Sequence, residues 1–561
     1  MKTKPKPILA IAKSLGIDKR YIESYGDYKA KISLDVLSKL KSRKTKSKYI
    51  VVTGMTPTHL GEGKTVTAIG LSMALNRIGV KSVACVKEPS LGSLFGIKGG
   101  AAGGGAARAI PAHDIHLNPT SDIHAVEVAH NLCAAYLDNH IYRGNKLNID
   151  PKRIFWHRVI DVNDRALRSV RIGLNNGDNG VERDSRIDIA AASEMLAIAA
   201  LSESIPDLRK RLSRVVVALT RSGKPVTCES LKCAGAMAAL LCEVIKPNLV
   251  QTSENTPCFI HTDPFANITH GNSSILADKI GLKLTDYVIT ESAFGSDCGA
   301  EKFFNIKCGA SGLVPDAAVL VCSIRALKAH SGMFNLVVGE PVDSRIYKEN
   351  LNGVEIGCEN LKKHIENIRL FGIPTVVVIN RFSTDTAREI ELVKTIALRG
   401  GAFHCVASDI YRSGSGGGVS LANAVIDAAQ GNSNFRCLYP LSMTLKDKIE
   451  RIARQVYGAK GVKYVPKAEE DIAFYQKLGY GKLPVCMAKT HLSISHDPKL
   501  TGVPRDFILP VVDVWPCTGA GFVYVLCEKT LTMRGLPASP VGEKIDIDSK
   551  GRILGLDGIT A

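Results

Sequence analysis

The chain has 561 residues, of which 45% are hydrophobic and 22% charged; this is the balance of a globular protein and allows roughly two to four structural units. No run of about 18 uncharged apolar residues is present, and Lys13 breaks the short apolar stretch near the amino terminus. Neither a membrane span nor a signal peptide is therefore expected. The formal net charge of +18 is spread along the chain, which favours small anionic ligands over nucleic acid.

The 15 cysteines form no CxxC pair, and the nearest two are Cys228 and Cys233. Because Cys/His ligand spacing is missing from the sequence, a structural zinc site is not expected. An odd number of cysteines in a long chain indicates reduced thiols, and the sequence therefore predicts a cytoplasmic protein.

From residue 49 onward, β-branched apolar runs alternate with stretches rich in Ala and Leu. Strands are predicted at 49–55, 82–87, 214–219, 286–290, 317–323 and 374–380. Helices are predicted at 66–78, 190–204, 229–245 and 446–458. Strands this apolar are typical of sheets covered on both faces. The pattern therefore predicts an α/β fold with a mostly parallel sheet and helices on both faces.

The pattern of the sequence changes after about residue 440, where a helical stretch is followed by short apolar runs that are interrupted by Pro and Gly. Boundaries are predicted near 460 and, less distinctly, near 365. This division gives a nucleotide-binding and catalytic domain of residues 1–365, an α/β domain of residues 366–460 and a smaller C-terminal domain of residues 461–561.

Residues 53–75 carry the most informative pattern: a buried strand, a glycine-containing loop, Gly63-Lys64-Thr65 and a helix. In a phosphate loop, backbone N–H groups hold nucleotide phosphates, the lysine reaches the β- and γ-phosphates, and the threonine hydroxyl ligates Mg²⁺. Thr58 stands where the strict pattern has glycine, so a turn that contains GKT by chance stays open as the alternative. We predict a P-loop NTPase-like site for ATP-Mg, with Thr65 as metal ligand, formed by Thr58, His59, Leu60, Gly61, Glu62, Gly63, Lys64 and Thr65.

Two further segments are predicted to face a ligand. The glycine-rich run 99–105, preceded by Lys98, allows the backbone to approach a phosphate or acyl group, although a tight packing turn would need the same glycines. A turn after a predicted strand carries Glu291, Asp297 and Glu301. Because ligands bind at the carboxyl ends of strands in open α/β sheets, one of these acids is a candidate cation ligand.

A series of sequence blocks runs from about residue 30 to the end of the chain. They are EPSLG (88–92), FGIKGGAAGGG (95–105), AHNLCAAYLDNHI (129–141), RVIDVNDRALR (158–168), GKPVT (223–227), KPNLVQT (246–252), PFANITHG (264–271), GAEKFFNIKC (299–308), RALKAH (325–330), ENLKKHIENI (359–368), LPVCMAKT (483–490) and GLPASPVGEKIDID (535–548). In their order and spacing the chain resembles the formate–tetrahydrofolate ligase (10-formyltetrahydrofolate synthetase) family.

The resemblance implies an ATP-dependent ligase that works in two steps. ATP phosphorylates formate to formyl phosphate, and the N10 amine of tetrahydrofolate then attacks this mixed anhydride to give 10-formyltetrahydrofolate. Such a site has to position phosphates and Mg²⁺, neutralise developing charge and keep water from the acyl phosphate. The resemblance also implies activation by a monovalent cation such as K⁺ or NH₄⁺, a homotetramer, and a folate site to which residues 366–460 contribute.

Residue by residue, the resemblance makes Lys64 and Lys87 the catalytic cations. Lys87 falls where the family has an arginine that helps to hold formyl phosphate. The residues predicted to contact formyl phosphate or folate are Lys87, Lys98, Gly103, Gly104, Phe382 and Tyr411. Of these, Phe382 and Tyr411 are expected to enclose the pterin, because stacking buries the π-surfaces of both partners.

The chain departs from the family at several positions near the predicted site. Lys87 replaces an arginine, a change that is not conservative at a bidentate contact. The other replacements are His59 and Leu60 for Pro-Ala, His157 for arginine, Thr262 and Asp263 for Gly-Gly, Ser383 for proline and Tyr411 for tryptophan. Three interpretations stay open: a divergent but active ligase, a paralogue that binds ATP but uses another acid and amine or has lost catalysis, and a different P-loop role.

Overall fold

The computed structural model describes residues 4–42, 46–96, 102–117, 119–175, 177–265, 267–334, 336, 342–431, 433–528 and 531–556. The predicted ligand contact Lys98 lies outside these residues, as do residues 99–101 of the glycine-rich run. Within the described residues, no helix combines the length and the apolar character that crossing a membrane requires.

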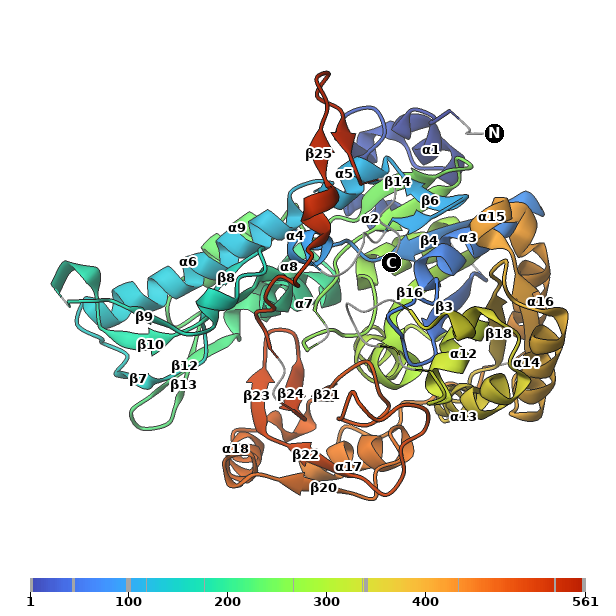
Figure 1. The fold of residues 1–561 in the computed structure, drawn as a ribbon. Coiled ribbons are helices and arrows are strands. Elements are labelled where there is room, and N and C mark those ends of the chain that lie inside the picture. Colours follow the sequence, from blue (N-terminus) through green and yellow to red (C-terminus); the bar gives the residue numbers. More distant parts are fainter. Residues whose placement is uncertain are drawn as a thin grey trace.

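A large, mostly parallel sheet lies at the centre of the molecule (Figure 1). Its parallel strands, in spatial order, are β15 (Pro257–Ile260), β4 (Ser82–Val86), β16 (Tyr287–Gly295), β3 (Lys48–Gly54), β17 (Ala317–Cys322), β18 (Thr375–Asn380) and β19 (His404–Ser408). Beyond β15 the sheet continues antiparallel through β14 (Asn248–Thr252), β2 (Ala30–Ile32) and β1 (Ile22–Ser24). The structure confirms the predicted α/β class and the predicted strands at 49–55, 82–87, 286–290, 317–323 and 374–380.

Helices cover both faces of this sheet, as the sequence predicts. Along β3 the buried side chains alternate: Tyr49 and Val51 belong to one hydrophobic core, and Ile50 and Val52 belong to another. The first core includes residues of α10 (Ile275–Leu284), α12 (Ile324–His330), α13 (Leu351–Arg369) and α14 (Ala387–Arg399). The second core includes residues of α3 (Lys64–Arg77) and α16 (Val419–Gln430).

A helical layer extends away from the central sheet, at the left of Figure 1. Its helices α6 (Asp122–Tyr142), α7 (Glu194–Leu201), α8 (Ile205–Ser213) and α9 (Ala234–Leu241) share a third hydrophobic core, which also includes Ile275 of α10 and Phe522 near the carboxyl end of the chain. The strand predicted at 214–219 lies in this layer rather than in the central sheet. It is β12 (Val216–Thr220), which pairs antiparallel with β13 (Pro225–Thr227) and β7 (Ile149–Ile154).

Two predicted helices are shorter than the sequence indicates. Within 190–204 the α-helix α7 begins only after Ser193, whose side-chain oxygen accepts from the Met195 N–H and caps the helix. Within 229–245 the helix α9 begins after Lys232, which has a left-handed φ of 60° that a helix cannot contain. In both places a local turn overrides an Ala- and Leu-rich composition.

The C-terminal part of the chain contains two helices and short sheets. They are α17 (Leu445–Gln455), which confirms the helix predicted at 446–458, α18 (Pro466–Lys477), β20 (Gly461–Tyr464) with β22 (Ile508–Val511), and β21 (Val485–Ala488) with β24 (Phe522–Leu526) and β23 (Asp513–Cys517). Tyr457, Ile472 and Val525 belong to the same hydrophobic core as Val51 of β3. The division of the chain at 365 and 460 stays a prediction.

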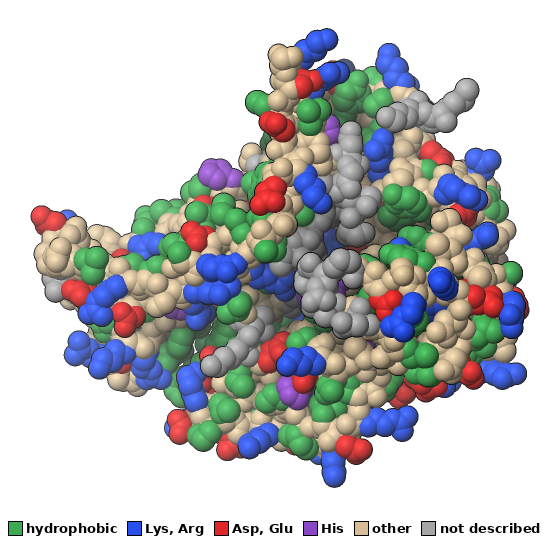
Figure 2. Space-filling view, in the orientation of Figure 1, with side chains coloured by type: hydrophobic (Ala, Val, Ile, Leu, Met, Phe, Trp, Pro, Cys, Tyr) green, Lys and Arg blue, Asp and Glu red, His purple; other side chains and the backbone are tan. Residues whose placement is uncertain are grey.

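Charged side chains of both signs are interspersed over the face of the molecule drawn in Figure 2. Lys and Arg side chains lie on the central part, on the helical layer and on the C-terminal part alike. On this face the basic side chains are therefore distributed rather than gathered into one patch.

Candidate functional site

The loop between β3 and α3 has the backbone geometry of an anion-binding turn. Helix α3 begins directly after Gly63, which has a left-handed φ of 81° and offers no side-chain cap. A Cβ at Gly63 would lie 2.4 Å from Asn380 Nδ2, and that amide donates to the Glu62 carbonyl at 3.0 Å. Both φ and space therefore require glycine here, and the uncapped amino end of α3 can bind an anion.

Lys64 is the first residue of α3, and its side chain folds back over the end of β3, where a Cβ at Gly54 would lie 3.0 Å from Lys64 Cδ. Desolvation by the surrounding protein lowers the pKa of Lys64. The carboxylates of Glu62 and Glu291 oppose this shift, and the ammonium of Lys87 adds to it. A bound phosphate would stabilise the protonated form of Lys64 in these surroundings.

Thr65 and Glu291 form a hydroxyl–carboxylate pair beside Lys64. The Thr65 hydroxyl donates to Glu291 Oε1 at 2.6 Å, and Glu291 extends from β16, the strand adjacent to β3. Glu291 is buried, and its other oxygen, Oε2, has no hydrogen-bond partner among the described residues. A hydroxyl and a carboxylate with an unpartnered oxygen are donors that fit Mg²⁺. Of the three acidic residues predicted as cation ligands, Glu291 is the one whose carboxylate forms a hydrogen bond with a residue of the predicted phosphate loop.

The remaining loop residues turn around the buried side chain of Glu62. Its Oε1 accepts from the Thr58 N–H at 2.7 Å and from the Thr58 hydroxyl at 2.9 Å. Gly61 has a left-handed φ of 72°, Leu60 packs against a small hydrophobic cluster, and His59 is exposed. The Thr58 N–H thus already has an anionic acceptor. A phosphate bound there would have to displace the Glu62 carboxylate from the Thr58 N–H.

A hydrogen-bonded cluster around Thr56, which precedes the loop, is not predicted by the sequence pattern. The Thr56 hydroxyl lies 2.9 Å from His364 Nε2 and accepts from Asn360 Nδ2 at 2.9 Å, while the Thr56 carbonyl lies 2.9 Å from His330 Nε2. Burial lowers the pKa of His364 to about 4, so this ring is neutral and its Nε2 can accept a hydrogen bond from the Thr56 hydroxyl. The blocks 325–330 and 359–368 contain these partners and were the signal that could have found them.

Lys87 follows β4 and forms an ion pair with Asp263, whose two carboxylate oxygens both lie 3.0 Å from Lys87 Nζ. Desolvation disfavours the charge on Lys87, but the carboxylates of Asp263 and Glu291 outweigh it and raise the pKa of Lys87. Thr262, next to Asp263, is buried with a left-handed φ of 49°, a conformation that favours glycine. The two departures from the family, Lys87 and Asp263, are therefore partners in space.

Phe382 and Tyr411 follow neighbouring parallel strands, β18 and β19, beyond their carboxyl ends. The guanidinium carbon of Arg325 lies 3.5 Å from the centroid of the Phe382 ring. Tyr411 lies in α15 (Ile410–Ser413) and is 43% exposed. The ring of Tyr411 is therefore available to stack on a ligand, whereas one face of Phe382 already holds a cation.

Two glycines of the run 99–105 pack closely against other residues. Gly103 belongs to β5 (Gly103–Gly104), and a Cβ there would lie 2.5 Å from the Ala107 carbonyl oxygen and 3.0 Å from Ile69 Cδ1 of α3. A Cβ at Gly105 would lie 2.2 Å from the Tyr411 carbonyl oxygen and 3.0 Å from the Tyr411 ring. Tight packing accounts for Gly103 and Gly105, and a role of the run in facing a ligand stays a prediction.

Comparisons with known proteins agree with the blocks found along the sequence. A family model described as formate–tetrahydrofolate ligase matches residues 1–557. The formate–tetrahydrofolate ligase of Roseiflexus castenholzii is 52% identical over 551 residues, which cover 98% of each chain. That of Desulforamulus reducens is 51% identical over 550 residues, which cover 98% of this chain and 97% of the relative. The chain therefore belongs to the formate–tetrahydrofolate ligase family.

Proposed function

We propose that this chain catalyses the ATP-dependent formylation of tetrahydrofolate at N10. A formate oxygen attacks the γ-phosphorus of ATP, which releases ADP and forms formyl phosphate; N10 then attacks the formyl carbon and phosphate leaves. The observation that carries this proposal is the position of Lys64 beside the Thr65–Glu291 pair at the uncapped amino end of α3, in a member of this family.

In this proposal the nucleotide phosphates bind at the amino end of α3, and Lys64 neutralises the charge that develops on the transferred phosphoryl group. The Thr65 hydroxyl and the Glu291 carboxylate would hold Mg²⁺, which would supply further neutralisation of phosphate charge. The desolvated surroundings of Lys64 support this role, because charges interact more strongly where water screens them less.

On the acceptor side, we assign Lys87 to formyl phosphate and the aromatic rings to folate. The Lys87 ammonium helps to lower the pKa of Lys64, and in this proposal both groups contact the phosphoryl group that is transferred. The exposed ring of Tyr411 stacks on the pterin, with Phe382 as the second aromatic contact. Both rings follow strands of the sheet in which β3 leads to the loop of Lys64 and β4 leads to Lys87, so N10 and the acyl phosphate would meet at the carboxyl ends of these strands.

The ion pair between Lys87 and Asp263 supports a second candidate function. A lysine that is already neutralised by a carboxylate at 3.0 Å offers less charge to formyl phosphate than a free cation does. A paralogue that uses another acid and amine, or that binds ATP without turnover, would fit this arrangement.

ADP release in a coupled assay distinguishes these functions. The proposed ligase releases ADP only when formate and tetrahydrofolate are both present, and Lys64→Ala abolishes that release. Lys224→Ala, which removes an exposed lysine in the helical layer, serves as the matched control and should leave the rate unchanged. ADP release with a different carboxylate, or ATP binding without turnover, would establish the second candidate instead.

The proposal includes a cytoplasmic homotetramer that a monovalent cation activates, as the family resemblance implies. Light scattering of the purified protein tests the subunit number. Assays in K⁺, NH₄⁺ and tetramethylammonium at equal ionic strength test the cation, with the first two expected to give higher rates than the third.

A further inference from the structure

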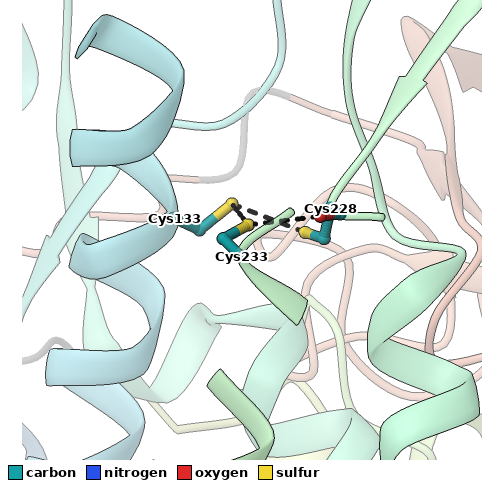
Figure 3. A group of neighbouring side chains, drawn as sticks. All are labelled: Cys133, Cys228 and Cys233. Atoms are coloured by element: carbon teal, nitrogen blue, oxygen red, sulfur yellow. Dashed lines mark hydrogen bonds between the residues drawn. The ribbon is translucent and has the colours of Figure 1, made fainter. Parts of the chain in front are cut away.

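Three buried cysteines from separate segments meet in the core of the helical layer (Figure 3). Cys133 lies on α6, Cys228 directly follows β13, and Cys233 directly precedes α9. The sulfur of Cys133 lies 3.4 Å from that of Cys228 and 3.8 Å from that of Cys233, and all three lie within 4.8 Å of one another. In the sequence only Cys228 and Cys233 are near one another. The fold brings Cys133, which is 95 positions from Cys228, next to them.

The spacing of these sulfur atoms is that of ligands around one metal ion. Metal–thiolate bonds of about 2.3 Å place the sulfurs about 3.8 Å apart in tetrahedral geometry and about 4.0 Å apart in a trigonal plane. The separations of 3.4 and 3.8 Å between the sulfur of Cys133 and those of Cys228 and Cys233 are within a few tenths of an ångström of these values. A disulfide, in contrast, would require two of the sulfurs to approach to about 2.05 Å.

The position of Cys233 also suits an anionic ligand atom. Cys233 stands at the amino end of α9, where the helix dipole favours negative charge. Arg209 is paired with Glu229, whose carboxylate lies 2.8 Å from Arg209 Nη1, so this pair adds no net charge beside the cluster. A metal ion bound by the three sulfurs would replace the protons of the thiols.

The donor set indicates which ion the cluster would take. Among the described residues, the three sulfurs form a candidate set without a histidine or carboxylate. Zn²⁺ in structural sites is almost always four-coordinate, and all three cysteines are buried from the water that could complete its shell. Thiolates select both Cu⁺ and Zn²⁺, but a structural Zn²⁺ site needs a fourth ligand that this group of three does not include. We propose that Cys133, Cys228 and Cys233 form a binding site for a soft metal ion, with Cu⁺ preferred over Zn²⁺.

Binding at this site would join α6, α9 and the segment after β13 across a core that the phosphate loop does not share. An ion that binds the folded chain and not the unfolded one stabilises the fold in proportion to its occupancy. Ion binding should therefore raise the melting temperature, and the site is independent of the proposed catalytic function.

The test uses the full-length protein, reduced and freed of metal, and titrates it anaerobically with Cu⁺ in competition with a chromophoric Cu⁺ chelator. The expected result is one Cu⁺ per chain, with a thiolate-to-copper absorption band in the ultraviolet. Alkylation followed by mass spectrometry should then find Cys133, Cys228 and Cys233 protected by Cu⁺. A parallel titration with Zn²⁺ should give weaker binding and less protection.

Variants assign the binding to these residues. Cys133→Ala and Cys233→Ala should each weaken Cu⁺ binding by more than about 100-fold, since the loss of a mere outer-sphere partner costs about 10- to 100-fold. Cys242→Ala removes a half-buried thiol at the other end of α9 and should bind Cu⁺ as the unaltered chain does.

The alkylation pattern of the unaltered protein shows which cysteines bind Cu⁺ even where a variant does not fold. Copper on other cysteines with the cluster still alkylated, tighter binding of Zn²⁺, or a disulfide within the cluster of the reduced protein would overturn the proposal.

Discussion

Glu291 is the residue on which the proposed metal site depends most, because it has one oxygen on the Thr65 hydroxyl and one without a partner. Glu291→Gln keeps the shape of the side chain but removes its charge. We expect the Mg²⁺ concentration for half-maximal ADP release to rise by about 10- to 100-fold, with partial rescue at high Mg²⁺. Asp286→Asn, directly before the same strand, is the control and should leave the Mg²⁺ dependence unchanged. If the Mg²⁺ dependence of Glu291→Gln were also unchanged, Glu291 would not be a ligand of the metal.

The Lys87–Asp263 pair allows a double-mutant cycle at the proposed acyl phosphate contact. Asp263→Asn frees the Lys87 ammonium, so the KM for formate should fall, whereas Lys87→Arg alone keeps the pair and restores a bidentate donor. We expect the two changes to be coupled by about 1 kcal/mol, which corresponds to a factor of about five in kcat/KM. Steady-state kinetics of both single variants and the double variant measure this coupling. Additive effects, or no change in formate KM and kcat, would count against the assignment of Lys87.

These two sites also show what a single sequence can and cannot predict at the residue scale. Lys64 and Thr65 were predictable because one strand, one loop and one helix bring them together within a few residues. The ion pair between Lys87 and Asp263 was not predictable, because the two residues are 176 positions apart and no sequence pattern relates them. The same is true of Thr56 and Asn360, whose side chains meet across 304 residues. Such contacts depend on the order of strands in the sheet, which sequence periodicity does not give.

At the scale of elements, the junction between β3 and α3 depends on the backbone of Gly63. Gly79, which ends the last turn after α3, has nearly the same φ of 85° but open space around its Cβ position, whereas Gly63 faces Asn380 Nδ2 at 2.4 Å. Gly79→Ala therefore measures the backbone strain alone, about 1–2 kcal/mol. Gly63→Ala should cost more in stability and should weaken ATP binding by more than about tenfold, equivalent to about 1.4 kcal/mol.

Calorimetric titration with a non-hydrolysable ATP analogue and urea unfolding measure the two effects separately. Adding Asn380→Ser to Gly63→Ala removes the amide that the new methyl group meets, and part of the ATP affinity should return. Equal unfolding free energies and unchanged ATP affinity in Gly63→Ala and Gly79→Ala would mean that the close approach of Asn380 to the loop has no consequence.

Prediction of the elements succeeded where burial alone dictates the pattern. The parallel strands are covered on both faces, so β3, β16, β17 and β18 appear in the sequence as continuous apolar, β-branched runs. The prediction of helix bounds failed where a local turn determines the first residue of the helix. The left-handed φ of Lys232, for example, makes α9 begin later than the sequence indicates. Prediction from the sequence also could not tell that 214–219 pairs outside the central sheet, because an apolar run does not reveal its partner strand.

At the scale of the whole molecule, one buried carboxyl group joins the helical layer to the C-terminal part. Glu194, the first residue of α7, accepts from the Gly519 and Ala520 N–H groups at 2.8 and 3.0 Å, in the turn between β23 and β24. Burial raises the pKa of Glu194 to about 7 in spite of these hydrogen bonds. The folded protein therefore keeps a proton on Glu194 at pH values where the unfolded chain, with an ordinary pKa of 4.5, has lost it.

The consequence for stability follows from this difference in proton binding. Below pH 4.5 Glu194 is protonated in both the folded and the unfolded protein, so its burial costs no stability. Between pH 4.5 and 7 the folded protein binds more protons than the unfolded chain, so the free energy of unfolding falls as the pH rises. Above pH 7 the loss of stability is constant at up to about 3 kcal/mol.

Glu194→Gln is neutral at every pH and keeps an oxygen that can accept from the two N–H groups. Urea unfolding from pH 4 to pH 8 should therefore show a stability gain over the unaltered protein that is near zero at pH 4 and reaches about 3 kcal/mol at pH 8. Glu470→Gln, at an exposed position of α18, should show no such slope. A gain that does not grow with pH would mean that Glu194 is ionised in the folded protein and that its hydrogen bonds outweigh its burial.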